Sequence, residues 1–164
     1  MEVFVLVEKK KSIIAMIGSW LCLCLAIVML LFACAASPLI IGVAVFGALW
    51  YFLQFRSNIE YEYSYFDGEI RFAKIMNKSR RKNLKSFTIG DVVQIAPSGD
   101  RSVYSYENDR MVKVVDYTSH KSEVPYYDMV INSEGVTYLY KLELDDKYLD
   151  AVCMKNASKV IRRQ

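Results

Sequence analysis

The chain has 164 residues, a net charge of +3 and four cysteines. Its length allows one membrane hairpin and one modest soluble domain of about 110 residues. The cysteines do not indicate a disulfide-stabilised fold, because most fall in an apolar segment and Cys153 falls in a segment that we expect to face the cytoplasm, where thiols stay reduced. The nearly neutral charge argues against a nucleic-acid-binding protein.

The N-terminal segment, residues 1–11, is apolar on alternate positions and also between them. Val3, Val5 and Val7 alternate with residues that include Phe4 and Leu6. A strand with one solvated face normally alternates apolar and polar residues, so this segment is not a simple exposed strand. An interfacial helix and a strand paired with the soluble domain both remain open.

The run from Ser12 to Gln54 contains no charged side chain. One crossing of the hydrocarbon core takes about 20 apolar residues, so the run is long enough for two helices. Pro38 lies inside it and suits a turn better than a helix interior, because proline lacks an amide donor. We therefore predict a transmembrane hairpin over residues 12–56, with helices at about 13–36 and 39–55.

The flanking charges predict the orientation of this hairpin. Lys9, Lys10 and Lys11 precede the first helix, and Arg56 follows the second. Positive charge near helix ends stays on the cytoplasmic side. We therefore expect a cell-membrane protein with two spans and both termini in the cytoplasm.

A cleaved signal peptide is the competing interpretation of the first apolar run. Ala33, Cys34 and Ala35 resemble a small-residue cleavage site. The apolar core is longer than the roughly 7 to 15 residues of a signal sequence, and a second apolar run follows at once. These features favour the transmembrane hairpin.

Small residues recur at helical spacing in both predicted spans. In lipid, small residues let helix backbones approach closely. We expect them to hold the hairpin together or to form a face for another membrane protein, and the absence of ionisable residues within the spans argues against a pump or ion pathway. The candidate packing residues are Ala15, Gly18, Cys22 and Ala26 in the first span and Ala44, Gly47 and Ala48 in the second.

From residue 57 the sequence changes to a period of two. Ile59, Tyr61, Tyr63 and Tyr65 alternate with polar residues, which predicts a half-buried strand, and Asp67-Gly68 predicts a tight hairpin turn. Further strands are expected at 69–76, 84–89, 92–96, 111–118, 124–131 and 136–144, in one antiparallel meander with a polar surface loop at 97–110. A short helix is the alternative for residues 111–118. In the last hairpin, one side of the sheet should carry Tyr127, Met129, Ile131, Tyr138, Tyr140, Leu142 and Leu144. A C-terminal amphipathic helix is expected at about 146–162, capped by Asp145 or Asp146.

Several of these segments carry a resemblance to a known family. Ile59–Tyr63, the turn at Asp67-Gly68, the basic run Lys78–Lys85 and Ile95–Pro97 resemble an uncharacterised family of small bacterial membrane proteins, and Lys147–Arg163 is similar to its closing helix. In that family a two-helix hairpin precedes a bacterial pleckstrin-homology-like (PH-like) domain. The resemblance implies an α+β membrane protein with an N-terminal two-helix transmembrane hairpin and a cytoplasmic PH-like antiparallel β barrel or sheet with one C-terminal helix. It implies no activity.

A group of basic residues forms the most informative polar feature, with no acid between Ile70 and Gly90. Such like charges repel one another unless anionic lipid, nucleic acid or the acidic residues later in the chain neutralise them. A domain tethered to a membrane meets acidic headgroups first. The alternative is a solvated face that helps to fix topology. The candidate lipid- or partner-binding residues are Arg71, Lys74, Lys78, Arg80, Arg81, Lys82 and Lys85.

The sequence offers little for catalysis. His120 is the only histidine, and a Ser-His-Asp arrangement with Ser119 or Ser122 and Asp116 lacks a nucleophile elbow. A single histidine with no nearby thiolate does not predict a zinc site. We therefore predict no metal, no cofactor and no enzyme, although an enzyme remains an alternative.

The predicted function follows from the anchor and the β domain together. We expect a non-catalytic binding or scaffolding protein that engages a protein, a peptide or anionic lipid headgroups at the inner membrane face. Tyr104 and Tyr106, in the polar loop, are expected to be exposed and available to a partner. The alternative is an accessory subunit that packs through its transmembrane helices in a larger membrane complex.

Overall fold

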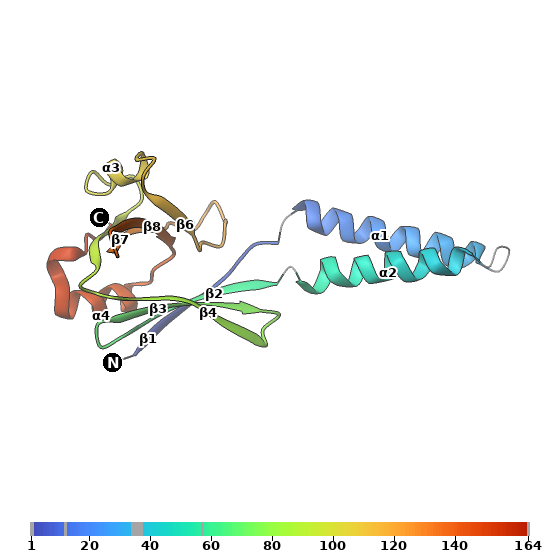
Figure 1. Cartoon of the computed structure of the whole chain (residues 1–164), viewed down its shortest axis with the longest axis horizontal. Coiled ribbons are helices and arrows are strands. Elements are labelled where there is room, and N and C mark those ends of the chain that lie inside the picture. The colour runs from blue at the N-terminus through green and yellow to red at the C-terminus, as the bar shows by residue number, and fades with distance from the viewer. Residues whose placement is uncertain (1, 12, 34–37, 57, 164) are drawn as a thin grey trace. The chain divides into compact units, whose positions relative to one another are not determined.

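The computed structural model divides the chain into two compact units, which are described separately (Figure 1). It describes residues 2–11, 13–33, 38–56 and 58–163. One unit comprises Lys10–Ile59 and Met76–Arg80, and the other comprises Met1–Lys9, Glu60–Ile75 and Arg81–Gln164. The first unit contains a helical hairpin, and the second is a β domain.

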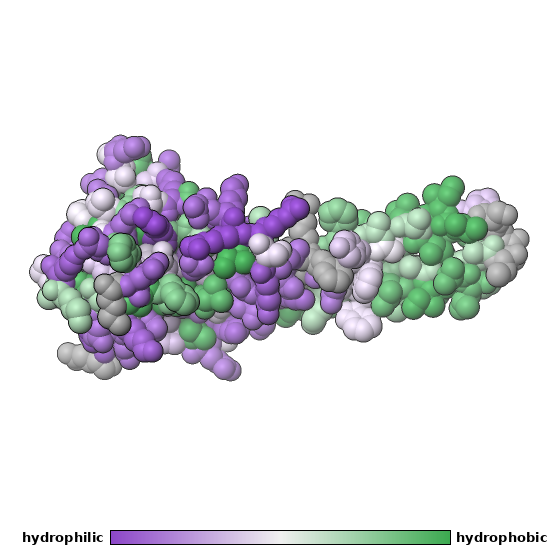
Figure 2. Space-filling view, turned by 90° about the horizontal axis from the view of Figure 1, so that it is seen from below, coloured by the Kyte–Doolittle hydropathy of each residue, from purple (hydrophilic) through white to green (hydrophobic). Residues whose placement is uncertain are grey.

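The hairpin consists of α1 (Ile13–Phe32) and α2 (Leu39–Arg56). Helix α1 ends before the predicted residue 36; Ala33 lies in a turn and residues 34–36 fall outside the described residues. Within the described chain, α1 is the one helix that is long and apolar enough to cross a membrane, with a mean hydropathy of 2.7, and the apolar part of α2, Leu39–Gln54, is shorter. Figure 2 shows a nearly continuous apolar surface on the hairpin and a mostly hydrophilic face on the β domain. The second span stays a prediction.

The first sheet of the β domain has four strands in the order β1-β2-β3-β4. They are β1 (Val3–Glu8), β2 (Ile59–Phe66), β3 (Glu69–Met76) and β4 (Arg80–Thr88). Strand β1 pairs antiparallel with β2, with Val3 opposite Tyr65 and Glu8 opposite Glu60. The N-terminal segment is therefore a strand of the β domain, which decides between the two alternatives left open by its sequence.

Tight turns join β2 to β3 and β3 to β4. Asp67 and Gly68 have φ angles of 48° and 91°, and Asn77 and Lys78 have φ angles of 52° and 55°. Two successive left-handed residues are typical of the type I′ turn, whose twist matches that of the flanking strands. The predicted hairpin at Asp67-Gly68 is thus confirmed.

The second sheet has the order β5-β7-β8-β6. Its strands are β5 (Val92–Pro97), β6 (Lys113–Asp116), β7 (Tyr127–Ser133) and β8 (Val136–Leu142). Met129 lies opposite Tyr140 and Ile131 opposite Tyr138, so the predicted shared side of this hairpin is confirmed. Strand β6, however, pairs parallel with β8. The prediction of one antiparallel meander is wrong, because the segment after β5 crosses to the far side of β8 before it becomes a strand.

The segment predicted as a polar surface loop contains a short helix, α3 (Tyr104–Glu107). Val103, just before it, is fully buried with Ala96, Val112, Val130 and Leu139 in a small core. Strand β7 therefore has buried residues on both of its faces.

Helix α4 (Asp146–Asn156) is shorter than the predicted helix at 146–162. Asp145 caps it by accepting a hydrogen bond from the Tyr148 N–H at 2.8 Å. A short 3-10 turn, Ala157–Lys159, follows, and the chain then pairs with β5, where the Ile161 N–H donates to the Ile95 carbonyl at 2.8 Å. This pairing replaces the last helical turns, because it satisfies the same backbone groups in extended form.

Candidate functional site

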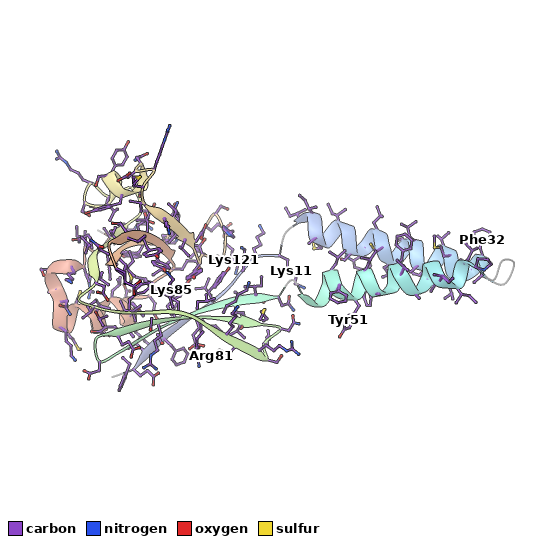
Figure 3. All side chains as sticks on the ribbon, viewed as in Figure 1. Lys11, Phe32, Tyr51, Arg81, Lys85 and Lys121 are labelled. Atoms are coloured by element: carbon purple, nitrogen blue, oxygen red, sulfur yellow. The ribbon has the colours of Figure 1, made fainter. Side chains whose placement is uncertain are left out.

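The predicted basic residues lie on two adjacent strands and the turn between them. Arg71 and Lys74 are on β3, Lys78 is in the turn, and the others are on β4. Arg71 contacts Glu69 at 2.6 Å, and Arg81, labelled in Figure 3, contacts Glu62 at 2.6 Å. The hydrogen bond that Arg71 donates to Glu69 raises the pKa of Arg71. Carboxylates of the same sheet therefore neutralise these two cations, rather than the acidic residues later in the chain.

Lys85 is held by aromatic rings instead of an acid. Its ammonium group lies 4.1 Å from the ring centroid of Tyr138 and 5.9 Å from that of Phe87. A cation over an aromatic face is attracted by the ring quadrupole. Lys85 on β4 of the first sheet thus contacts Tyr138 on β8 of the second sheet. This contact between the sheets gives it a structural role.

The other basic residues have no ion-pair partner among the described residues. They are Lys74, Lys78, Arg80 and Lys82, and all except the half-buried Lys74 are exposed. We call this set the basic end of the β3–β4 hairpin. Its cations are the ones available to an external anion.

The basic end lies close in space to the chain that leaves α2. The Asn77 N–H donates to the Asn58 carbonyl at 3.0 Å, and Asn58 follows Arg56, the last residue of α2, by two residues. Two residues span at most about 7 Å. Chain connectivity therefore keeps the turn at Lys78 beside the end of an apolar helix.

In the helical hairpin, the predicted packing residues are only partly at the interface. Ala26 is 8% exposed, and Ala15, Gly18 and Cys22 are half-buried. In α2, Ala44 and Ala48 are exposed, and a Cβ added to Gly47 would meet nothing within 4 Å. Sequence reasoning missed Ser19, which is 1% exposed, and Gly42, where an added Cβ would lie 2.5 Å from the Met29 Sδ.

Several of the less exposed positions of both helices follow spacings of alternately three and four residues. This is the spacing of a coiled-coil seam, in which side chains of one helix fit between those of the other. In α1 these positions are Ala15, Ser19, Cys22, Ala26 and Met29, and in α2 they are Leu39, Val43, Phe46, Trp50 and Leu53. Gly18, Leu23, Gly42 and Gly47 are also less exposed and flank this seam. The seam pairs small residues of α1 with large residues of α2, which explains why small residues alone did not locate the α2 face.

His120 lies beside a polar hollow of about 340 Å³ in the β domain. Its Nδ1 is 3.5 Å from Asp116 Oδ2. The Ser119 hydroxyl donates to Glu143 at 2.7 Å instead of contacting the histidine. No hydrogen bond joins the His120 ring to Ser119 or Ser122 in the described part of the chain, and no group of three potential metal ligands occurs there. The contacts do not assemble the Ser-His-Asp arrangement.

Two further predicted positions differ in exposure. Tyr104 is 61% exposed, as expected. Tyr106 is not freely exposed, because it packs against the small core around Val103. Of these two tyrosines, Tyr104 is the one whose ring is exposed.

A buried acid is the polar feature that sequence reasoning missed. Asp128 on β7 is 0% exposed, and no described group donates a hydrogen bond to either of its carboxyl oxygens. Burial, followed by the neighbouring Glu107 carboxyl, raises the pKa of Asp128 to about 7. Glu107 in turn accepts from the Gly99 N–H at 2.8 Å. The alternation of apolar and polar residues in β7 did not indicate a buried acid. It placed Asp128 on a face that we expected to be exposed, and α3 covers that face.

The comparisons with known proteins identify a family. The family described as Bacterial PH-like domain (DUF6106) matches residues 1–162, a range that includes both helices and the β domain. No curated protein and no solved structure was found to match the chain. With two sheets, a C-terminal helix and this match over nearly its whole length, the chain belongs to the bacterial PH-like domain family.

Proposed function

We propose that this protein is a membrane-anchored, non-catalytic binding protein. Its apolar hairpin crosses the membrane twice, and its β domain contacts anionic lipid headgroups at the inner face through the basic end. Membership of a PH-like family supports a binding or scaffolding role in general. The membrane anchor is supported by α1, which has the length and composition of a span.

The observation that carries the proposal is the hydrogen bond between Asn77 and Asn58. It keeps Lys78 and its neighbours close in space to the end of α2. When α2 ends at the bilayer surface, these cations lie at headgroup depth. Each basic side chain near an anionic surface contributes on the order of 1 kcal/mol, so three or four of them produce measurable, salt-sensitive binding.

The test uses the full chain in nanodiscs, because β1 belongs to the β domain and a fragment that begins after the hairpin lacks it. We expect amide hydrogen exchange of Met76–Leu84 to be slower in nanodiscs with anionic lipid than in zwitterionic ones, at low salt only. Replacing Lys78, Arg80 and Lys82 with Gln should remove this difference. Equal exchange in both lipids would contradict the proposal.

A matched control variant separates local contact from general charge. Arg101, Lys121 and Lys147 are exposed and lie on other elements of the β domain. Replacing these three with Gln removes the same net charge, and we expect it to leave the protection of Met76–Leu84 unchanged.

A second candidate function is supported by the outer face of α2. Ala44 and Ala48 are exposed and Gly47 meets no neighbour, so small residues point away from α1. Small residues permit close helix approach in lipid. In that role the protein is an accessory subunit of a membrane complex. Replacing Gly47 with Leu should then release the partner from the purified complex and leave the α1–α2 seam intact.

A further inference from the structure

The segment between β5 and β6 covers one face of the second sheet. Tyr140 on β8 stacks on a ring of the first sheet, so its neighbours Leu139 and Lys141 lie on the opposite, outer face. Figure 1 shows α3 on this outer side, away from β2 and β3. We call Ser98–Val112, which includes α3, the α3 cover.

Val103 packs the α3 cover onto the sheet. Its side chain is fully buried in the small core that also contains Ala96 of β5, Val130 of β7 and Leu139 of β8. Helix α3 has four residues, which is too short for a helix to be stable through its own hydrogen bonds. The cover is therefore held by its contacts with the sheet rather than by its own secondary structure.

Glu107, the last residue of α3, fastens the helix to the beginning of the cover. Its carboxylate accepts hydrogen bonds from the Gly99 N–H at 2.8 Å and from the Ser98 hydroxyl at 3.4 Å. The Ser98 N–H in turn donates to the carbonyl of Tyr126, just before β7, at 3.3 Å. The carboxylate of Glu107 is therefore held next to the start of β7.

Asp128 lies on β7 beneath the α3 cover. It is opposite Ala96 in the β5–β7 pairing, and the alternation of β7 places its side chain on the same face as Val130. The side chain is 0% exposed, and no described group donates a hydrogen bond to either of its carboxyl oxygens. Burying an ionised carboxylate in this way carries a large free-energy cost. A proton removes this cost, because the protonated carboxyl group is neutral.

The charged groups that face Asp128 come from α3 and β8. Glu107 approaches from the cover, and Lys141 lies directly opposite Asp128 on β8. Lys141 is also opposite Asp116 on β6, and its ammonium group lies 5.4 Å from the ring centroid of Tyr126, so Asp128 shares this cation with other groups. Burial and the Glu107 carboxyl raise the pKa of Asp128 to about 7, and Lys141 offsets this rise only in part. The start of the cover, β5 and the C-terminal segment contribute the uncharged Ser98, Ala96 and Ile161.

Loss of the proton from Asp128 acts on the contact between the cover and the sheet. Two carboxylates, Asp128 on the sheet and Glu107 on the cover, then face each other beside one shared ammonium group. Lifting the cover separates the two charges and lets water reach Asp128, while β5, β7 and β8 stay paired. Short surface segments open at a lower free-energy cost than a whole domain. The cover is therefore the first part of the β domain to respond.

We propose that the α3 cover is a proton-dependent latch, which protonated Asp128 holds closed on the second sheet and which opens when this proton is lost. Opening exposes Ala96, Val130 and Leu139, which form an apolar surface that is buried in the closed state. The latch goes beyond the proposed function, and its argument does not depend on the membrane.

The direction of the pH dependence follows from the two states of the latch. In the closed state the pKa of Asp128 is about 7, and in the open state, where water solvates the carboxylate, it returns to the ordinary value of about 4. The closed state is therefore most favoured at a pH below the ordinary aspartate pKa, and this advantage is lost as the pH rises towards 7. Each pH unit in this window changes the opening equilibrium by at most about tenfold.

Amide hydrogen exchange of the full chain in zwitterionic nanodiscs tests the latch. The amides of Tyr106 and Glu107 report on the cover, because both donate to the Val103 carbonyl, at 2.9 and 3.1 Å. After correction for the intrinsic pH dependence of amide exchange, we expect their protection to fall by about tenfold between pH 5.5 and pH 7.5. Low concentrations of urea should leave this exchange unchanged, because local opening exposes little surface.

Matched variants assign the effect to the two facing carboxyl groups. Asp128→Asn should make the protection of the cover nearly independent of pH, and Glu107→Gln should reduce its dependence. Asp109 is an exposed acid of the same cover that accepts from the Met111 N–H at 2.8 Å, and Asp109→Asn should keep the full dependence.

Three results would overturn the latch. The first is protection of the wild-type cover that does not change with pH, and the second is an undiminished pH dependence in Asp128→Asn or in Glu107→Gln. The third is exchange of the cover at the same rate and with the same urea dependence as β7, because the β domain then opens as one unit.

Discussion

The ring of Phe72 on β3 stacks on the ring of Tyr140 on β8, with 4.8 Å between centroids and 16° between planes. The contact joins the two sheets at the centre of the β domain. Phe72 is 1% exposed and also meets Phe87 edge to face at 6.2 Å. Aromatic rings from both sheets therefore hold the domain together, and the first sheet contributes more of them than the second.

Phe72→Ala should lower the free energy of unfolding of the β domain by about 3–5 kcal/mol, the usual cost of removing a buried aromatic side chain. Urea unfolding of the full chain in detergent, followed by near-UV circular dichroism of the tyrosines, measures this loss. Phe66 is 51% exposed, and Phe66→Ala should cost less than about 1 kcal/mol. Similar losses for both variants would contradict the central role of Phe72.

The raised pKa of Asp128 predicts that the free energy of unfolding of the β domain depends on pH. Its pKa is raised in the folded protein to about 7, so the folded state binds a proton that the unfolded state has released. Stability from this group is present below the ordinary aspartate pKa and is lost as the pH rises towards 7, by at most about 1.4 kcal/mol per pH unit. Urea unfolding between pH 5 and pH 8 measures the slope.

Two variants isolate the contribution of Asp128. Asp128→Asn supplies a permanent donor to Glu107, so we expect it to flatten the slope and to be relatively more stable at pH 8. Glu107→Gln removes the like charge and should reduce the slope. Lys141, opposite Asp128 across the β7–β8 pair, stays unchanged in both. An unaltered slope in Asp128→Asn would show that another group titrates in this window.

The cap of α4 is a local test of the C-terminal structure. Asp145→Ala should cost about 1 kcal/mol, because the Tyr148 N–H loses its acceptor. Hydrogen exchange of the first turn of α4 should accelerate accordingly. Asp145→Asn keeps an acceptor and should restore most of the protection, and Asp146→Ala, in the first helical turn, is the matched control.

The packing of α1 against α2 predicts which positions tolerate a larger side chain. Ala26 is 8% exposed in the seam and Ala48 lies outside it. Ala26→Leu should destabilise the hairpin by about 1–3 kcal/mol through overpacking, and Ala48→Leu should leave it unchanged. Thermal unfolding of the hairpin in detergent, followed by Trp20 and Trp50 fluorescence, distinguishes the two.

Much of the β domain could be predicted from local sequence. The alternation of Tyr61, Tyr63 and Tyr65 and the turn at Asp67-Gly68 are local signals, so the first strands were correct. The parallel pairing of β6 with β8 was missed because it depends on where a long connection crosses the sheet. Residues within that connection carry no period that reveals the burial of Val103.

In the candidate site too, the features set by local sequence were predicted and those set by the arrangement of strands were not. The sequence located the basic residues, because charge is visible in composition. It did not show that Glu62 pairs with Arg81, since that contact depends on the order of strands in the sheet. Nor did it show that β1 is an edge, because edge and centre strands differ only in what lies beside them.

The most direct measurement of the membrane proposal is cysteine labelling with an impermeant maleimide in intact cells, using a chain whose native cysteines are replaced. The account predicts that Ser37→Cys, whose position lies outside the described residues and which we expect outside the cell, is labelled in intact cells. Tyr104→Cys should be labelled only after permeabilisation. Labelling of Tyr104→Cys in intact cells, or recovery of the protein in the soluble fraction, would contradict a two-span anchor with a cytoplasmic β domain.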